Sequence, residues 1–230
     1  MLGTMKNKIA NVVVLLSFGI AAAAASAQDA KPGDAAAGQK KADMCIGCHG
    51  IAGYQASFPE VYKVPKIAGQ NSKYIVAALN GYKKGERKHP SMRGIAGSLS
   101  EQDMADLAAY FEQLGKSGDG EQAKPAAAAA AAPPPEVAKL LAQANCASCH
   151  GANFSTPIDP SYPKLAGQYP DYLYAALRAY QTDHNPVMGR SNAIMMGMAR
   201  PFKHAEIKAL AQYISTLPGD LKTAAQSRFR

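Results

Sequence analysis

All four cysteines of the chain stand in two copies of one pattern, CIGCHG at 45–50 and CASCHG at 146–151. In each copy two residues separate the cysteines, and a histidine follows the second one. Two thiols at this spacing can add across the two vinyl groups of a porphyrin, which places the adjacent imidazole beneath the iron. The pattern therefore predicts two covalently bound haem c groups. The attachment residues are Cys45, Cys48, Cys146 and Cys149.

Other uses of paired cysteines fit the pattern less well. Two disulfides would not require a histidine after each pair. A thioredoxin-like site is expected once, beside a βαβ pattern that this sequence lacks. Zinc needs a fourth ligand, and neither copy has a second cysteine pair nearby. Covalent haem is the interpretation that explains every cysteine.

Residues 1–27 have the parts of an export signal. Lys6 and Lys8 precede an uncharged run from Asn11 to Ala27, which fades into alanine and ends in Ala-Ser-Ala. The competing interpretation is a membrane anchor, but the apolar part is shorter than the ~20 residues that span a bilayer. We expect cleavage after about Ala27 and a mature protein in the periplasm.

The net charge gives little support to a nucleic-acid partner. The formal charge of +8 falls to +6 when Lys6 and Lys8 leave with the leader. Two propionates on each haem would cancel much of that excess. We therefore expect no nucleic-acid binding, although a basic protein often has that function.

The chain repeats itself beyond the cysteine motif. PKIAGQNSKYIVAALNGY at 65–82 matches PKLAGQYPDYLYAALRAY at 163–180, and a second block at 92–111 matches 195–214. A repeat of this length has the size of a domain. We expect an N-terminal domain at 28–117 and a C-terminal domain at 135–230. The segment 118–134 between them has seven consecutive alanines and several prolines, which predicts a linker.

Each repeat has the apolar spacing of helices and no alternating stretch long enough for a sheet. In the first repeat Ser100 precedes two acids, so a helix is expected up to Leu114, with Gly115 ending it. In the second repeat the corresponding helix is expected from Glu206 to Leu217. The fold class is all-α, with two tandem cytochrome c-like domains, each a small helical fold around one haem.

One methionine stands at the same place in both repeats and is the candidate for the second axial ligand. Met92 and Met195 follow His49 and His150 by 43 and 45 residues, each shortly before the last helix. A thioether favours ferrous iron and fills the sixth position, which suits electron transfer and argues against catalysis. The second repeat has three rival methionines that stay open as alternatives. They are Met188, Met196 and Met198.

Four further residues are candidates for contacts around the haems. Pro65 and Pro163 could hold a carbonyl against the free ring nitrogen of each histidine. Arg87 and Arg190 lie five residues before the aligned methionines and could pair with propionates. Ordinary loop prolines and solvated arginines are the alternatives. His89 and His184 are expected to be surface histidines.

Taken together, these motifs resemble the cytochrome c4 family. The resemblance rests on two C-x-x-C-H-G units, P-K-x-A-G-Q, Y-x-x-A-A-L, R-x-x-x-x-M and the final A-x-Y helix, and covers nearly all of residues 35–217. It implies two c-type folds, electron delivery from a quinol-oxidising cytochrome complex towards a terminal oxidase, and a histidine contact from the carbonyls of Pro65 and Pro163. The Ala/Pro-rich segment looks longer than the family needs, which argues against a tightly packed, two-fold-like pairing of the halves.

Two other functions are the alternatives. The chain could be the haem-bearing subunit of a periplasmic dehydrogenase, or a catalytic two-haem enzyme such as a peroxidase. An enzyme needs an open iron site with an acid or base beside it, and the aligned methionines argue against that. The expected partners are redox proteins, with peripheral membrane association as a further alternative. The sequence does not indicate an oligomeric state.

Overall fold

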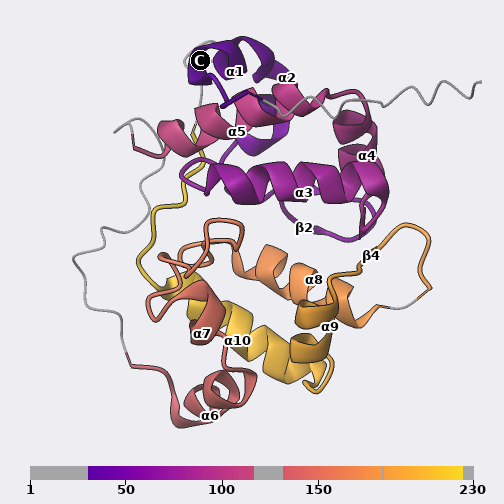
Figure 1. Cartoon of the computed structure of the whole chain (residues 1–230). Coiled ribbons are helices and arrows are strands. Elements are labelled where there is room, and N and C mark those ends of the chain that lie inside the picture. The colour runs from indigo at the N-terminus through magenta and orange to yellow at the C-terminus, as the bar shows by residue number, and fades with distance from the viewer. Residues whose placement is uncertain (1–30, 117–131, 183, 225–230) are drawn as a thin grey trace, which may run out of the picture.

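A computed structural model describes residues 31–116, 132–182 and 184–224, and the chain forms two helical halves stacked on each other (Figure 1). The expected all-α class is confirmed, because the strands are two residues long and every larger element is a helix. The expected leader and most of segment 118–134 lie outside the described residues. Within the described residues, none of the helices has the length and apolar character that crossing a membrane requires.

The first half contains five helices and three short strands among the described residues. They are α1 (Ala35–Lys41), α2 (Asp43–His49), β1 (Gln55–Ala56), β2 (Tyr62–Lys63), α3 (Ser72–Lys84), β3 (Arg87–Lys88), α4 (Pro90–Gly97) and α5 (Glu101–Leu114).

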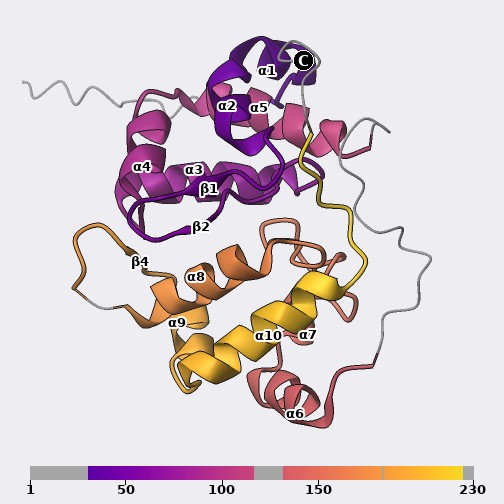
Figure 2. The same ribbon diagram turned by 180° about the vertical axis from the view of Figure 1, so that it is seen from behind.

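The second half repeats this order in its described residues, without a counterpart of the β1–β2 pair. Its elements are α6 (Pro135–Ala144), α7 (Ala147–His150), α8 (Pro170–Gln181), β4 (Gly189–Arg190), α9 (Ala193–Ala199) and α10 (His204–Thr216). Figure 2 shows the two halves from behind.

The last helix of each half forms where the sequence predicts it. Helix α5 begins after Ser100, whose side chain accepts from the backbone of Asp103, while the Asp103 carboxylate accepts from the backbone of Ser100. This reciprocal pair satisfies two free N–H groups of the first turn. Helix α10 begins at His204, two residues before the predicted start, because the carboxylate of Glu206 accepts from the backbone N–H of Lys203 at 2.7 Å.

Helices α1 and α5 cross at very close range. A Cβ added to Gly38 of α1 would collide with the backbone oxygen of Asp106 and would lie 2.8 Å from Cβ of Tyr110. The carboxylate of Asp106 is buried beside this crossing, where it accepts from the Lys41 ammonium at 2.8 Å and from the backbone N–H of Asp34 at 2.9 Å. Glycine at position 38 is therefore what lets the two backbones touch.

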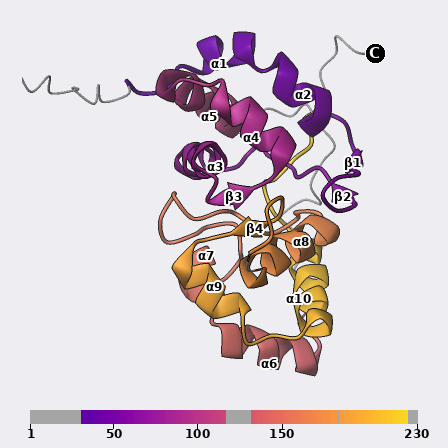
Figure 3. The same cartoon turned by 90° about the vertical axis from the view of Figure 1, so that its right-hand side faces the viewer.

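The halves pair through equivalent segments of the repeat. Strand β3 pairs with β4 in antiparallel register, so that Arg87 lies opposite Arg190 (Figure 3). The side chain of Gln70 bonds the backbone of Lys164, and Gln168, its counterpart, bonds the backbone of Lys66. Contacts of this reciprocal kind define a two-fold-like interface. The length of segment 118–134 argues against a tightly packed, two-fold-like pairing of the halves. That interpretation is wrong, because buried polar contacts between equivalent loops hold the halves together.

A segment after α10 also joins the halves. The chain from 219 to 224 leaves the second half and runs along the first one towards α1 and α2, as Figures 1 and 2 show. The backbone N–H of Lys222 donates to the oxygen of Ala68 at 3.0 Å, and Leu221 has no exposed surface. A Cβ on Gly50, next to the first CxxCH histidine, would lie 3.1 Å from the oxygen of Ala224.

Candidate functional site

Both CxxCH motifs lie on short helices that line one continuous cavity. The cavity has a volume of about 910 Å³ and extends across the interface between the halves. Cys45 and Cys48 face it from α2, while Cys146 and Cys149 face it from α7 and the residue before it. All four thiols are free and half-buried, and burial raises the pKa of Cys45 to about 11.

The two motif histidines are held in one orientation by proline carbonyls. Nδ1 of His49 lies 2.8 Å from the oxygen of Pro65, and Nδ1 of His150 lies 3.0 Å from the oxygen of Pro163. A carbonyl can only accept, so Nδ1 carries the proton and the lone pair is left on Nε2. Burial lowers the pKa of both rings, which favours this neutral form. Each imidazole is thus ready to bind a metal through Nε2.

Met92 and Met195 occupy equivalent places on the cavity wall. The backbone N–H of Met92 donates to Nδ1 of His89, which caps α4, and that of Met195 donates to Oδ1 of Asn192, which caps α9. Both side chains line the cavity that contains the motif histidines.

The rival methionines differ in their position. Met198 also lines the cavity, but 46% of it is exposed. Met196 is absent from the cavity wall, and Met188 lines a separate small pocket beside β3 and β4.

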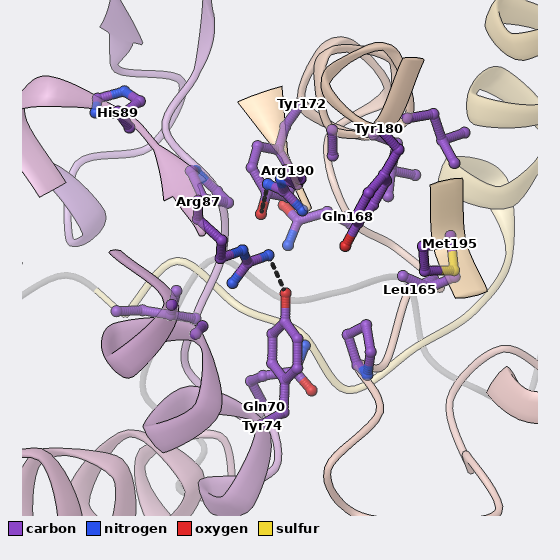
Figure 4. A pocket seen from close by; sticks show the side chains of 18 of the residues that line it. Gln70, Tyr74, Arg87, His89, Leu165, Gln168, Tyr172, Tyr180, Arg190 and Met195 are labelled. Atoms are coloured by element: carbon purple, nitrogen blue, oxygen red, sulfur yellow. Dashed lines mark hydrogen bonds between the residues drawn. The ribbon is translucent and has the colours of Figure 1, made fainter. Parts of the chain in front are cut away.

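Arg87 and Arg190 lie in a cluster of tyrosines at the interface (Figure 4). The guanidinium of Arg87 donates to the hydroxyl of Tyr74 at 2.7 Å, and that of Arg190 donates to the hydroxyl of Tyr172 at 3.1 Å. Burial raises the pKa of Tyr74 to about 12. Burial would also raise the pKa of Tyr172, but the guanidinium groups of Arg190 and Arg87 hold it below its usual value. Within the described residues neither arginine pairs with a carboxylate, so the cluster is strongly positive.

Of the three histidines outside the motifs, His89 and His184 are expected at the surface. His184 is exposed, as expected. The expectation of a surface histidine is wrong for His89, which is half-buried with its ring centroid 6.4 Å from those of Tyr62 and Tyr82. Its role in capping α4 explains why it points inward.

The cavity wall has few carboxylates that could serve as an acid or base, although His89 also lines it. Among the described residues that line it, the one carboxylate is that of Glu86. The backbone oxygen of Glu86 accepts from the backbone N–H of Ser191 across the interface at 2.9 Å. Glu86 thus takes part in the contact between the halves through its backbone.

The residues present fit two haem c groups. Each half brings two free thiols, an imidazole with its Nε2 lone pair available and a thioether to the same apolar space. The zinc alternative has no matching cluster, because the described residues contain no group of three or more His, Cys, Asp or Glu placed to hold a metal.

Sequence reasoning did not single out Gln70 and Gln168. Both are 4% exposed, and each bonds the backbone of the opposite half. They end the A-G-Q that occurs in both repeats. A polar residue that recurs at the same place in both repeats is the signal in the sequence that could have found them.

The chain matches known proteins along most of its length. The family model described as cytochrome c matches it twice, over residues 35–115 and 135–218. Cytochrome c4 of Azotobacter vinelandii is 32% identical over 223 residues, covering 90% of this chain and 97% of that protein. The crystal structure of reduced recombinant cytochrome c4 from Pseudomonas stutzeri has a TM-score of 0.57 and 30% identity, covering 80% of this chain and 99% of that one.

A relative with a different printed name is also similar. The thiosulfate dehydrogenase electron acceptor of Thiomonas intermedia is 29% identical over 196 residues, covering 82% of this chain and 85% of that protein. Each of the two family matches contains one cysteine pair and its histidine. The chain therefore carries two covalently bound haem c groups and transfers electrons.

Proposed function

Because the chain belongs to the cytochrome c4 family, we propose that it is a periplasmic carrier that takes electrons from a quinol-oxidising cytochrome complex and delivers them to a terminal oxidase. Each haem, when bound, supplies a centre that changes by one electron. The observation that carries the proposal is the pairing, in both halves, of an oriented histidine with a methionine on one cavity wall.

His49 with Met92, and His150 with Met195, would hold the two haem irons. Equivalent capping contacts place the two methionines at the third position of α4 and of α9, which favours Met195 over its neighbours. A methionine in the sixth position excludes oxygen and peroxide and raises the reduction potential. This ligation supports electron transfer rather than peroxidase chemistry, and the scarcity of carboxylates on the cavity wall supports the same conclusion.

Arg87 and Arg190 would hold haem propionates. Two guanidinium groups on one cavity wall without a carboxylate partner among the described residues form a site for anions. Their backbones pair in the β3–β4 register, so one contact between the halves would orient both propionate sites.

The electron-carrier proposal is tested by following both transfer steps. The reduced protein should appear when the oxidised one is mixed with a detergent-solubilised quinol-oxidising complex and a quinol. It should then be reoxidised by a membrane fraction that contains a terminal oxidase. Absence of both steps, with the protein still reducible by dithionite, would refute the proposed pathway. Detection of the chain in a cytoplasmic fraction instead of a periplasmic extract would refute the location.

A dehydrogenase partner is the second candidate, supported by the similarity to a thiosulfate dehydrogenase electron acceptor. The test is the rate of haem reduction by purified thiosulfate dehydrogenase with thiosulfate, compared with the rate given by the quinol-oxidising complex. A faster rate with the dehydrogenase at equal concentration would make it the donor. Tetrathionate, as the product of thiosulfate oxidation, would be measured in the same reaction.

We also propose that 28–117 and 135–230 are the two domains and that 118–134 links them. The two family matches fall within these ranges. Limited proteolysis should therefore cut first within 118–134, and the two fragments should stay associated through their shared interface. Initial cleavage inside either range would argue against these boundaries.

A further inference from the structure

The peptide unit that orients each motif histidine is also bonded by a glutamine from the opposite half. We propose that Gln168 is a positioning residue for His49, and Gln70 for His150, each acting across the interface through a Pro–Lys peptide. The proposal rests on the proposed function in one respect, namely that these histidines are axial ligands.

In the first half the contact is a short chain of hydrogen bonds. Nδ1–H of His49 donates to the carbonyl of Pro65 at 2.8 Å. The N–H of that same peptide belongs to Lys66 and donates to Oε1 of Gln168 at 3.0 Å. Nε2 of Gln168 then donates to the carbonyl of Lys66 at 2.9 Å. The glutamine thus bonds both backbone groups of Lys66, and one of them, the N–H, belongs to the peptide that binds the histidine.

The second half has the same chain with the roles of the halves exchanged. His150 donates to the carbonyl of Pro163 at 3.0 Å, and the N–H of Lys164 donates to Oε1 of Gln70 at 2.9 Å. Nε2 of Gln70 donates to the carbonyl of Lys164 at 3.0 Å. Two independent copies of one arrangement make a chance contact a poor explanation.

Both glutamine side chains are fixed in place. Each is 4% exposed, and each Oε1 accepts a second bond, from the following backbone N–H, at 3.0 Å. The amide cannot be reversed, because its nitrogen would then face an N–H and its oxygen a carbonyl. A buried amide whose oxygen and nitrogen both have hydrogen-bond partners fixes the position of the backbone that it bonds.

The chemical consequence follows from polarisation along the peptide. An acceptor on the N–H of Lys66 makes the carbonyl of Pro65 a stronger acceptor, since chained hydrogen bonds strengthen one another. A stronger bond at Nδ1 makes the imidazole a more basic ligand, which favours ferric iron. Gln168 therefore lowers the potential of the haem in the first half, although it belongs to the second. Gln70 does the same to the haem of the second half.

This crosswise arrangement gives a signature that a purely structural role would not produce. The test uses the whole holoprotein in a Met195→His background, in which the haem of the second half titrates at a lower potential and leaves the other step resolved. In this background Gln168→Met should shift the step of the first haem upward. The matched control is Gln70→Met. Gln70 lies in the same half as the observed haem, so this substitution should leave the reduction potential of that haem unchanged.

A mirrored experiment in a Met92→His background observes the haem of the second half. There Gln70→Met should raise the reduction potential of that haem, and Gln168→Met should leave it unchanged. Gln168→Glu, which retains an acceptor for the N–H of Lys66, should not give the upward shift. Two results would overturn the proposal. One is an equal shift of the observed potential in Gln168→Met and Gln70→Met, and the other is a shift only of the haem in the half that carries the substituted glutamine. An upward shift from Gln168→Glu would also overturn it.

A second measurement does not depend on the identity of the axial ligands. Exchange of the Lys66 amide proton, followed by NMR, should accelerate in Gln168→Met and stay slow in Gln70→Met, with the reverse for Lys164. Unchanged protection in both variants would overturn the proposal even if the potentials moved. If the Met195→His variant moves neither reduction step, the ligand assignment fails, while the exchange data still decide whether the crosswise contact exists.

Discussion

Replacing Gly38 by alanine tests how closely α1 crosses α5. The new methyl group would collide with the backbone oxygen of Asp106 and lie 2.8 Å from Cβ of Tyr110. Real Cβ atoms do not approach backbone at this range, so the helices must separate. Overpacking of this kind lowers the free energy of unfolding by about 3 kcal/mol at the upper end of its range. The better helix propensity of alanine raises it by about 1 kcal/mol, so the expected net loss of unfolding free energy is about 2 kcal/mol.

A loss of that size should lower the Tm of the holoprotein by roughly 4–8 °C, given its length. Thermal unfolding followed by far-ultraviolet circular dichroism measures it. The control is Gly97→Ala at the end of α4, where a Cβ would meet nothing within 4 Å. It gains helix propensity without the collision, so its Tm should rise by at most about 4 °C. Equal Tm changes in the two variants would refute the close crossing.

Three further outcomes are expected from single substitutions. The pKa of Asp106 is lowered by its bonds to the backbone of Asp34 and to Lys41. Its charge therefore stabilises the fold above about pH 4, and this contribution is lost as the carboxylate protonates at lower pH. Asp106→Asn should reduce the fall in Tm on acidification, and an unchanged acid profile would contradict this. Met195→Ala should let carbon monoxide bind one haem, while Met196→Ala should not; the opposite result would reassign the ligand. Leu221→Ala should cost about 2–5 kcal/mol in denaturant unfolding, and a loss below about 1 kcal/mol would mean that the segment after α10 is loosely held.

The haem chemistry and the helices could be predicted because both depend on local spacing. CxxCH contains three of the groups that a haem c needs within five residues, so no tertiary contact is required to recognise it. The start of α5 follows from Ser100 and Asp103, which lie within one turn. The short helix α4 is missing from the prediction because its N-cap is His89, which is not a residue type that usually signals a helix start.

The relation between the halves could not be predicted, because it depends on residues far apart in the chain. The length of segment 118–134 argues against a tightly packed pairing, yet equivalent loops of the two repeats form a buried polar interface. Gln168 and Lys66 are separated by 102 positions, and no pattern within either repeat relates them. The clue in the sequence is that both members of such a pair recur at the same offset, Lys66 with Lys164 and Gln70 with Gln168. A repeated polar pair of this kind is what a two-fold contact requires.

The segment 219–224 has a consequence for the order in which the protein can be assembled. Chains are made from the N-terminus, so the first CxxCH motif is complete long before the residues that pack beside Gly50 and Ala68 exist. Until the segment has been made, the side of the first half beside Gly50 and Ala68 stays uncovered. The last described residues then close over it and join the two halves. Neither cysteine motif lies in this segment, so a chain shortened before Leu221 should receive both haems and yet leave the first half without its final cover.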